Sequence, residues 1–171
     1  MEKKGQVWVE TVIYTLIGLV VIGILLAAAQ PKIAEMKDKA IIEQTISSLN
    51  EVNSKIYEVQ FAEGNKRIVS LSVSKGNFYV DGANNQIGWI MDSNYKYSEP
   101  GVVLPLGNMK VVTQKGSPYS VRFFIEYNLN LTSVGLDSVS NLSSSPTPYR
   151  LSIENKGKNS AGLSNIDLSA S

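Results

Sequence analysis

The sequence predicts an α+β fold, in which a long N-terminal α-helix precedes a C-terminal head built as an antiparallel β-sheet or sandwich. Three observations lead to this prediction. Residues 11–29 form an uncharged apolar run, residues 33–59 carry apolar side chains at helical spacing, and short segments after residue 60 alternate between apolar and polar side chains. The 171 residues suffice for about one compact domain plus an appendage.

The apolar run is long enough to cross a membrane as a helix. It contains no charged residue over residues 11–29, and residues 7–9 extend it beyond a single acid, Glu10. A helix needs roughly 20 apolar residues to cross about 30 Å of hydrocarbon. A soluble helix that is apolar on every side is unusual, so we interpret this segment as membrane-embedded.

The helix is expected to continue after the apolar run as an amphipathic segment. Spacings of three and four place one set of apolar side chains on a single stripe: Ile33, Met36, Ala40, Ile42, Ile46, Leu49, Val52, Ile56 and Val59. The predicted helix covers residues 7–61, with Pro31 removing one backbone donor. Packing on the chain's own head is favoured over a coiled coil, because the charges do not occupy heptad e and g positions.

Strand patterns fill the rest of the chain. Val121, Phe123 and Ile125 belong to its cleanest alternation. The predicted strands are residues 69–74, 78–80, 87–91, 109–112, 119–129, 149–154 and 166–168. Residues 131–148, rich in Ser, Thr and Pro, are predicted to form an exposed loop.

The composition removes several classes of chemistry. The chain has no cysteine and no histidine, which excludes zinc fingers, cysteine nucleophiles and Ser-His-Asp triads. We therefore expect no metal, no cofactor and no enzymatic activity, and the dispersed acids Asp81, Asp92, Glu99 and Glu126 lack the spacing of a catalytic pair. A net charge of +1 with scattered basic residues makes nucleic acid an unexpected partner.

The first ten residues carry the strongest functional signal. Lys3, Lys4 and Gly5 precede Gln6, and Glu10 is the fifth residue counted from Gln6. This pattern resembles the class III signal peptide of archaeal type IV pilin precursors, although Trp8 stands where that pattern often has a small residue. The resemblance covers about the first 30 residues and implies that a prepilin peptidase cuts after Gly5.

The resemblance implies four segments. Residues 1–5 are a basic leader, 6–30 a transmembrane and filament-core helix, 31–61 an amphipathic helix, and 62–171 an extracellular β-rich head. The expected function is that of a structural subunit of a type IV pilus-like filament, with the precursor in the cytoplasmic (inner) membrane and the mature protein on the cell surface. Implied partners are identical or related subunits and the pilus assembly machinery. Glu10 would neutralise the new amine of Gln6 during assembly, since an unpaired carboxylate is costly in lipid.

Two alternatives remain open from the residues. Ala27, Ala28 and Ala29 resemble the cleavage site of an ordinary secretory signal, which would release a soluble protein. An uncleaved single-span anchor differs only in leaving Gly5 intact. In either case the β-domain would act as a binding module, tethered to the membrane or secreted.

Two N-glycosylation triplets lie in or beside the Ser-rich stretch. They begin at Asn130 and Asn141. Modification of either asparagine would require the head to lie outside the cell.

Overall fold

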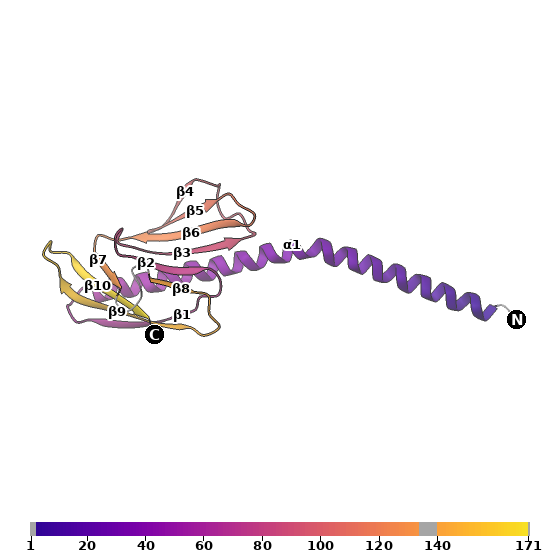
Figure 1. Ribbon diagram of the computed structural model, residues 1–171, viewed down its shortest axis with the longest axis horizontal. Helices are drawn as coiled ribbons and strands as arrows, with labels where there is room; N and C mark the ends of the chain where they lie inside the picture. The colour runs from indigo at the N-terminus through magenta and orange to yellow at the C-terminus, as the bar shows by residue number, and fades with distance from the viewer. Residues whose placement is uncertain (1–2, 134–139, 171) are drawn as a thin grey trace. The chain divides into compact units, whose positions relative to one another are not determined.

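The computed structural model describes residues 3–133 and 140–170, and it describes side chains over residues 8–133 and 141–170. The chain divides into two compact units, Met1–Lys37 and Asp38–Ser171, which we describe separately. Helix α1 (Lys3–Val59) forms the described part of the first unit and continues into the second (Figure 1). The described strands all lie in the second unit, here called the head, which confirms the predicted α+β class.

Helix α1 begins four residues before the predicted start and ends two before the predicted end. It continues through Pro31, whose ring leaves the carbonyl of Ala27 without its usual helical donor. At the C-terminal end, the side-chain amide of Asn155 donates to the carbonyl of Val59 at 3.0 Å. Gly64 then turns the chain with φ of +78°, a backbone conformation that glycine adopts without strain.

Two sheets form the head. The strands are β1 (Lys66–Leu71), β2 (Asn77–Asp81), β3 (Gln86–Ser93), β4 (Val103–Leu106), β5 (Met109–Gln114), β6 (Tyr119–Glu126), β7 (Asn130–Ser133), β8 (Ser140–Ser143), β9 (Tyr149–Lys158) and β10 (Ser164–Ala170). The six-stranded sheet has the order β4-β5-β6-β3-β2-β8, and the four-stranded sheet has the order β1-β9-β10-β7. All pairs are antiparallel except β10 with β7, which is parallel.

One face of α1 completes the core of the head. Ile42, Leu49, Val52, Ile56 and Val59 have no exposed surface, and they form a single core cluster with the inward side chains of both sheets. The largest fully buried sheet side chains include Trp89, Phe78, Phe123, Ile87 and Ile125. The predicted packing of the helical stripe on the chain's own head is thus confirmed from Ile42 onward.

The prediction was wrong at the start of the stripe. Ile33 is 49% exposed and Met36 is 64% exposed. Both lie in the first unit, before the head begins at Asp38. Ala40, the next residue of the predicted stripe, is exposed as well.

The Ser-rich stretch over residues 131–148 was also partly misassigned. It contains most of β7 and all of β8, and Leu131 and Leu142 are buried in the core. Each of these strands has four residues and a single buried apolar side chain, which is too short for a recognisable alternation. Strand β4 was missed because all four of its residues are exposed and one of them is Pro105.

Candidate assembly segment and the Asp38 contact

The apolar segment of the first unit is uncovered on every side. Every large apolar side chain from Trp8 to Leu26 is at least 37% exposed, and Trp8, Tyr14 and Leu19 reach about 70%. The helix that carries them is long and apolar enough to cross a membrane by length and composition. We call residues 8–29 the assembly segment. The hydrophobic effect favours moving such a surface into lipid or against other apolar helices.

The expected processing residues lie at the start of α1. Lys3, Lys4, Gly5 and Gln6 have helical backbone, while their side chains lie outside the described residues. Glu10 is exposed, and no ion pair links it to any side chain in the described part of the chain. The helix places Glu10 one turn after Gln6, which is the spacing at which two helical residues share a face.

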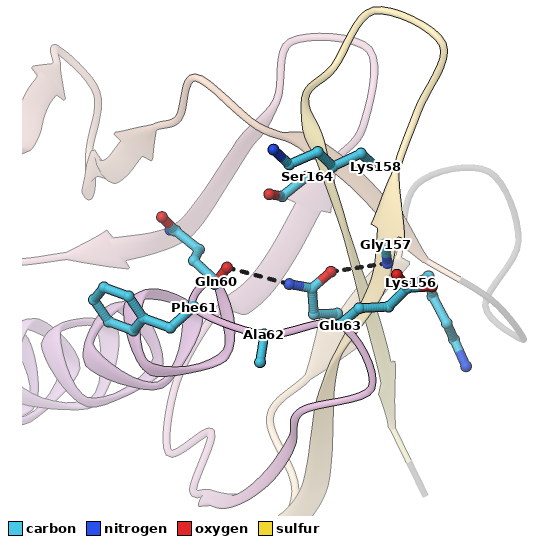
Figure 2. Close-up of a pocket in the computed structure, with 9 residues that line it drawn as sticks. Gln60, Phe61, Ala62, Glu63, Lys156, Gly157, Lys158 and Ser164 are labelled. Carbon is cyan, nitrogen blue, oxygen red and sulfur yellow. Dashed lines mark hydrogen bonds between the residues drawn. The ribbon is translucent and has the colours of Figure 1, made fainter.

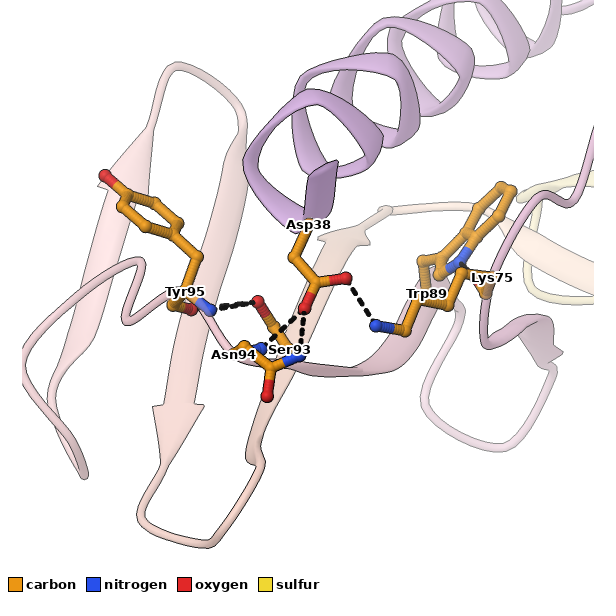
Figure 3. Close-up of polar contacts among 6 residues, drawn as sticks. All are labelled: Asp38, Lys75, Trp89, Ser93, Asn94 and Tyr95. Carbon is orange, nitrogen blue, oxygen red and sulfur yellow. Dashed lines mark hydrogen bonds and ion pairs between the residues drawn. The ribbon is translucent and has the colours of Figure 1, made fainter. Parts of the chain in front are cut away.

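At the other end of the exposed helix, Asp38 joins α1 to two loops of the head (Figure 3). Its carboxylate accepts a hydrogen bond from Lys75 Nζ, in the segment between β1 and β2. It also accepts from the backbone N–H of Asn94, at 2.6 Å, and from Asn94 Nδ2, at 2.9 Å. The carbonyl of Lys75 in turn accepts from Trp89 Nε1 at 2.9 Å. The contact therefore connects the helix to the centre of the core.

Asp38 is buried, with 5% of the residue exposed. Burial by itself disfavours ionisation, but the hydrogen bonds from Lys75 and Asn94 outweigh it and hold the pKa of Asp38 below its ordinary value. Sequence reasoning missed this residue because Lys37 and Lys39 flank it in what looks like a solvated charge run. The available signal was its spacing of four residues before Ile42, which places Asp38 on the buried stripe.

A shallow polar pocket lies where α1 meets β9 (Figure 2). Asn155 forms its inner wall: Nδ2 donates to the carbonyls of Val59 and Gln60, and Oδ1 accepts from the N–H of Gly157 at 2.9 Å. These bonds satisfy carbonyls at the helix end that have no helical partner. We interpret the pocket as a structural junction between the end of α1 and β9.

The dispersed acids stay apart in the structure. Asp81 bonds to Asn84 and Gln86, Glu99 pairs with Lys96, and Glu126 pairs with Lys110. Asp92 is exposed on β3. Over residues 3–133 and 140–170, no group of three or more acidic, histidine or cysteine side chains is placed to hold a metal ion.

The two candidate glycosylation sites differ in their surroundings. Asn130 Nδ2 donates to Asn165 Oδ1 at 2.6 Å, and the hydroxyl of Thr132, two residues later, donates to Asp167 Oδ1 at 3.1 Å. The amide of Asn130 and the hydroxyl of Thr132, which an N-glycosylating enzyme must recognise, are therefore both hydrogen-bonded to β10. Asn141 lies in β8, at the edge of the six-stranded sheet, and is exposed.

No protein-family model, curated protein or solved structure matches the chain. Its function is therefore inferred from its own residues. The geometry supplies an apolar helical surface that needs an external apolar environment, and a head whose core is complete without one.

Replacing Asp38 by Asn is expected to lower the free energy of unfolding of the head by about 2 kcal/mol at pH 7, because Lys75 loses its charged partner at a buried site. A carboxyl with a lowered pKa stabilises the fold above its ordinary value of 3.8 and loses that effect as the pH falls through the lower folded value. The gap between wild type and Asp38→Asn should therefore close in acid. Thermal unfolding followed by circular dichroism at several pH values measures this.

Glu43→Gln is the matched control, because Glu43 is an exposed acid on the same helix. Its stability should equal that of wild type at every pH. Equal stability of Asp38→Asn and wild type at pH 7 would show that the Asp38 contact contributes nothing net.

Proposed function

We propose that this chain is a structural subunit of a type IV pilus-like extracellular filament. A prepilin peptidase cuts after Gly5, the assembly segment holds the precursor in the cytoplasmic membrane, and assembly moves that segment into a bundle of identical helices. The head then lies on the outside of the filament. The subunit contact is heterologous and repeats helically, which builds a filament instead of a closed ring.

The observation that carries the proposal is the contrast between the two parts of α1. From Asp38 to Val59 one face of the helix is buried in the head, whereas the assembly segment is exposed around its full circumference. A helix that served only to lie on its own domain would bury one face throughout. Exposure on all sides fits a segment that is surrounded first by lipid and then by neighbouring helices.

The glycines of the assembly segment fit the same proposal. A Cβ added at Gly18 or at Gly23 would meet no atom within 4 Å, so the chain's own packing does not require a small residue at either position. Small residues in apolar helices allow close approach of a second helix. Transfer from lipid to a helix bundle changes apolar burial little, so packing at such positions and the pairing of Glu10 would drive assembly.

The first test is the N-terminus of the mature protein. We expect terminal mass spectrometry of protein from the native host to find Gln6 as the first residue, and Gly5→Leu to remain uncut because the peptidase has little room for a side chain there. A mature chain that begins at Gln30 would instead establish secretion by an ordinary signal peptide. An intact Met1 would favour a tethered binding module.

The second test separates processing from assembly. Glu10→Gln should be inserted and cut normally, yet give at least about tenfold less sheared extracellular filament, because the amine of Gln6 would lack its counter-charge in an apolar core. A simple anchor would tolerate the change, since losing a charge favours residence in lipid. Glu43→Gln serves as the control and should assemble as wild type does. Unchanged filament yield from Glu10→Gln would remove Glu10 from the assembly mechanism.

We further expect Asn141, and not Asn130, to carry any N-linked glycan. Transfer to a folded head needs a free amide and a free hydroxyl, and at Asn130 both are bonded to β10. In a glycosylating host, Asn141→Gln should abolish the mass increase of the intact protein and Asn130→Gln should preserve it. The reverse result would show that transfer precedes the pairing of β7 with β10.

A further inference from the structure

Arg122 occupies the middle of the outward face of the six-stranded sheet. On β6, Val121 and Phe123 point into the core with no exposed surface, so Arg122 between them points outward. Its direct cross-strand neighbours are Ile90 on β3 and Val112 on β5. The site lies entirely within the head.

The guanidinium is held by two aromatic rings on the same face. Arg122 Nε donates to the hydroxyl oxygen of Tyr79 at 2.7 Å. Its Cζ lies 5.3 Å from the centre of the Tyr79 ring and 5.1 Å from that of Phe124, within the range of cation–π attraction. Gly88 makes this arrangement possible, because a Cβ at that position would collide with the Tyr79 ring. Arg122 is thus fixed in place before any ligand arrives.

The outer edge of the same guanidinium has no acceptor in the described part of the chain. The only hydrogen bond that Arg122 makes there is the one from Nε to Tyr79. Glu126, on the same strand, is paired with Lys110 at 2.7 Å, and Asp81 is occupied by Asn84 and Gln86. Two parallel N–H groups on a fixed guanidinium match the two oxygens of one carboxylate.

We propose that Arg122 is the recognition residue of a binding site on this face for the carboxylate of an acidic polysaccharide. The site goes beyond the proposed filament function and stands whether or not the chain forms filaments. Binding would form two charge-assisted hydrogen bonds from the terminal nitrogens of Arg122, while Tyr79 keeps Nε in place.

The surroundings favour a sugar over a protein partner. Next to Ile90 the face carries uncharged hydrogen-bonding side chains: Asn77 on β2 pairs with Ile90 on one side and with Ser143 on β8 on the other. Such groups can bond to sugar hydroxyls. Ile90, the more exposed of the two apolar residues in register with Arg122, is 39% exposed, and the more exposed Val103 lies one strand further away, on the edge strand β4.

The acids on the same face disfavour a ligand with a charge on every unit. Asp92 and Glu126 are both exposed there, on β3 and β6. A phosphate backbone would bring repeated negative charges against them. A polysaccharide that places a carboxylate on some of its sugars can present one to Arg122 while hydroxyls face the acids.

The test measures binding of full-length protein in detergent micelles to hyaluronan oligosaccharides, in which every second sugar carries a carboxylate, with uncharged chitin oligosaccharides as the matched ligand. Isothermal titration should detect wild-type binding to the acidic polymer and not to the neutral one. Arg122→Gln should lose affinity by about tenfold or more, because it removes a charge-assisted bidentate contact. Arg122→Lys should lose most of the affinity as well, since an ammonium lacks the planar fork.

Two further variants separate recognition from folding. Tyr79→Phe keeps the ring but removes the hydroxyl that holds Nε, so it should weaken binding several-fold while thermal unfolding stays near that of wild type; it carries the test if Arg122→Gln does not fold. Arg150→Gln is the matched control, because Arg150 is an exposed arginine on β9 of the other sheet. It should leave the affinity unchanged.

Four outcomes would overturn the proposal. Wild-type protein that binds neither polymer, or that binds as tightly as Arg122→Gln and Tyr79→Phe, would show that the face is not such a site. An equal loss of affinity with Arg150→Gln would show that binding depends on the overall charge of the protein and not on Arg122. Self-association that depends on Arg122, without binding to the hyaluronan oligosaccharides, would identify the acceptor as a carboxylate of a second copy of this chain.

Discussion

The burial of one face of α1 against both sheets is the interaction on which the head depends. Leu49 and Ile56 have no exposed surface, and the inward residues of both sheets share one core cluster with them. The two sheets do not have separate cores, so removal of the helix would open the inner faces of both. Polar contacts fix both ends of the part of α1 that lies in the head: Asp38 bonds to two loops where that part begins, and Asn155 bonds to the last carbonyls of the helix. The head therefore includes the second part of α1 as an integral element.

The two parts of α1 differ in how their apolar side chains are exposed to solvent. Up to Leu26 its large apolar side chains are exposed on all sides, whereas after Asp38 one apolar face is buried in the head. Ile33 and Met36 lie in the short stretch between these parts, where Lys32 and Glu35 form an ion pair at 2.7 Å. A chain with this organisation has a domain that is stable on its own contacts, joined to a surface that only lipid or other chains can satisfy. That combination underlies both the filament proposal and the tethered alternative.

Sequence patterns were sufficient for the large elements and insufficient for contacts between distant segments. The long helix, its buried stripe from Ile42 onward and seven of the strands follow from periodicity, because each has several apolar residues in a regular order. The four-residue strands β7 and β8 have one buried apolar residue each, and β4 has none, so periodicity could not reveal them. The start of the head at Asp38 could not be predicted from periodicity either.

The candidate sites divide in the same way. The candidate processing and assembly residues around Gly5 and Glu10 were identified from the order of neighbouring residues in the sequence, and their roles stay predictions. The importance of Asp38 and Arg122 depends on partners in other strands and loops. Alternation along β6 places Arg122 on the outer face, but only the register of β2 and β3 brings Tyr79 and Gly88 beside it. Asp38 likewise needs Lys75 and Asn94, which come far later in the chain.

The pairing order of the four-stranded sheet has a consequence for biosynthesis. Strand β1 pairs only with β9, and β10, the last strand, lies between β9 and β7. Strand β1 has no strand neighbour in this sheet until β9 has been synthesised, and β7 has none until β10 has been synthesised. Such non-local pairing is slow, because the intervening chain must close first. The apolar residues of β1 and β7 therefore stay without their sheet partners while the intervening chain is made, and during that time they depend on protection by chaperones.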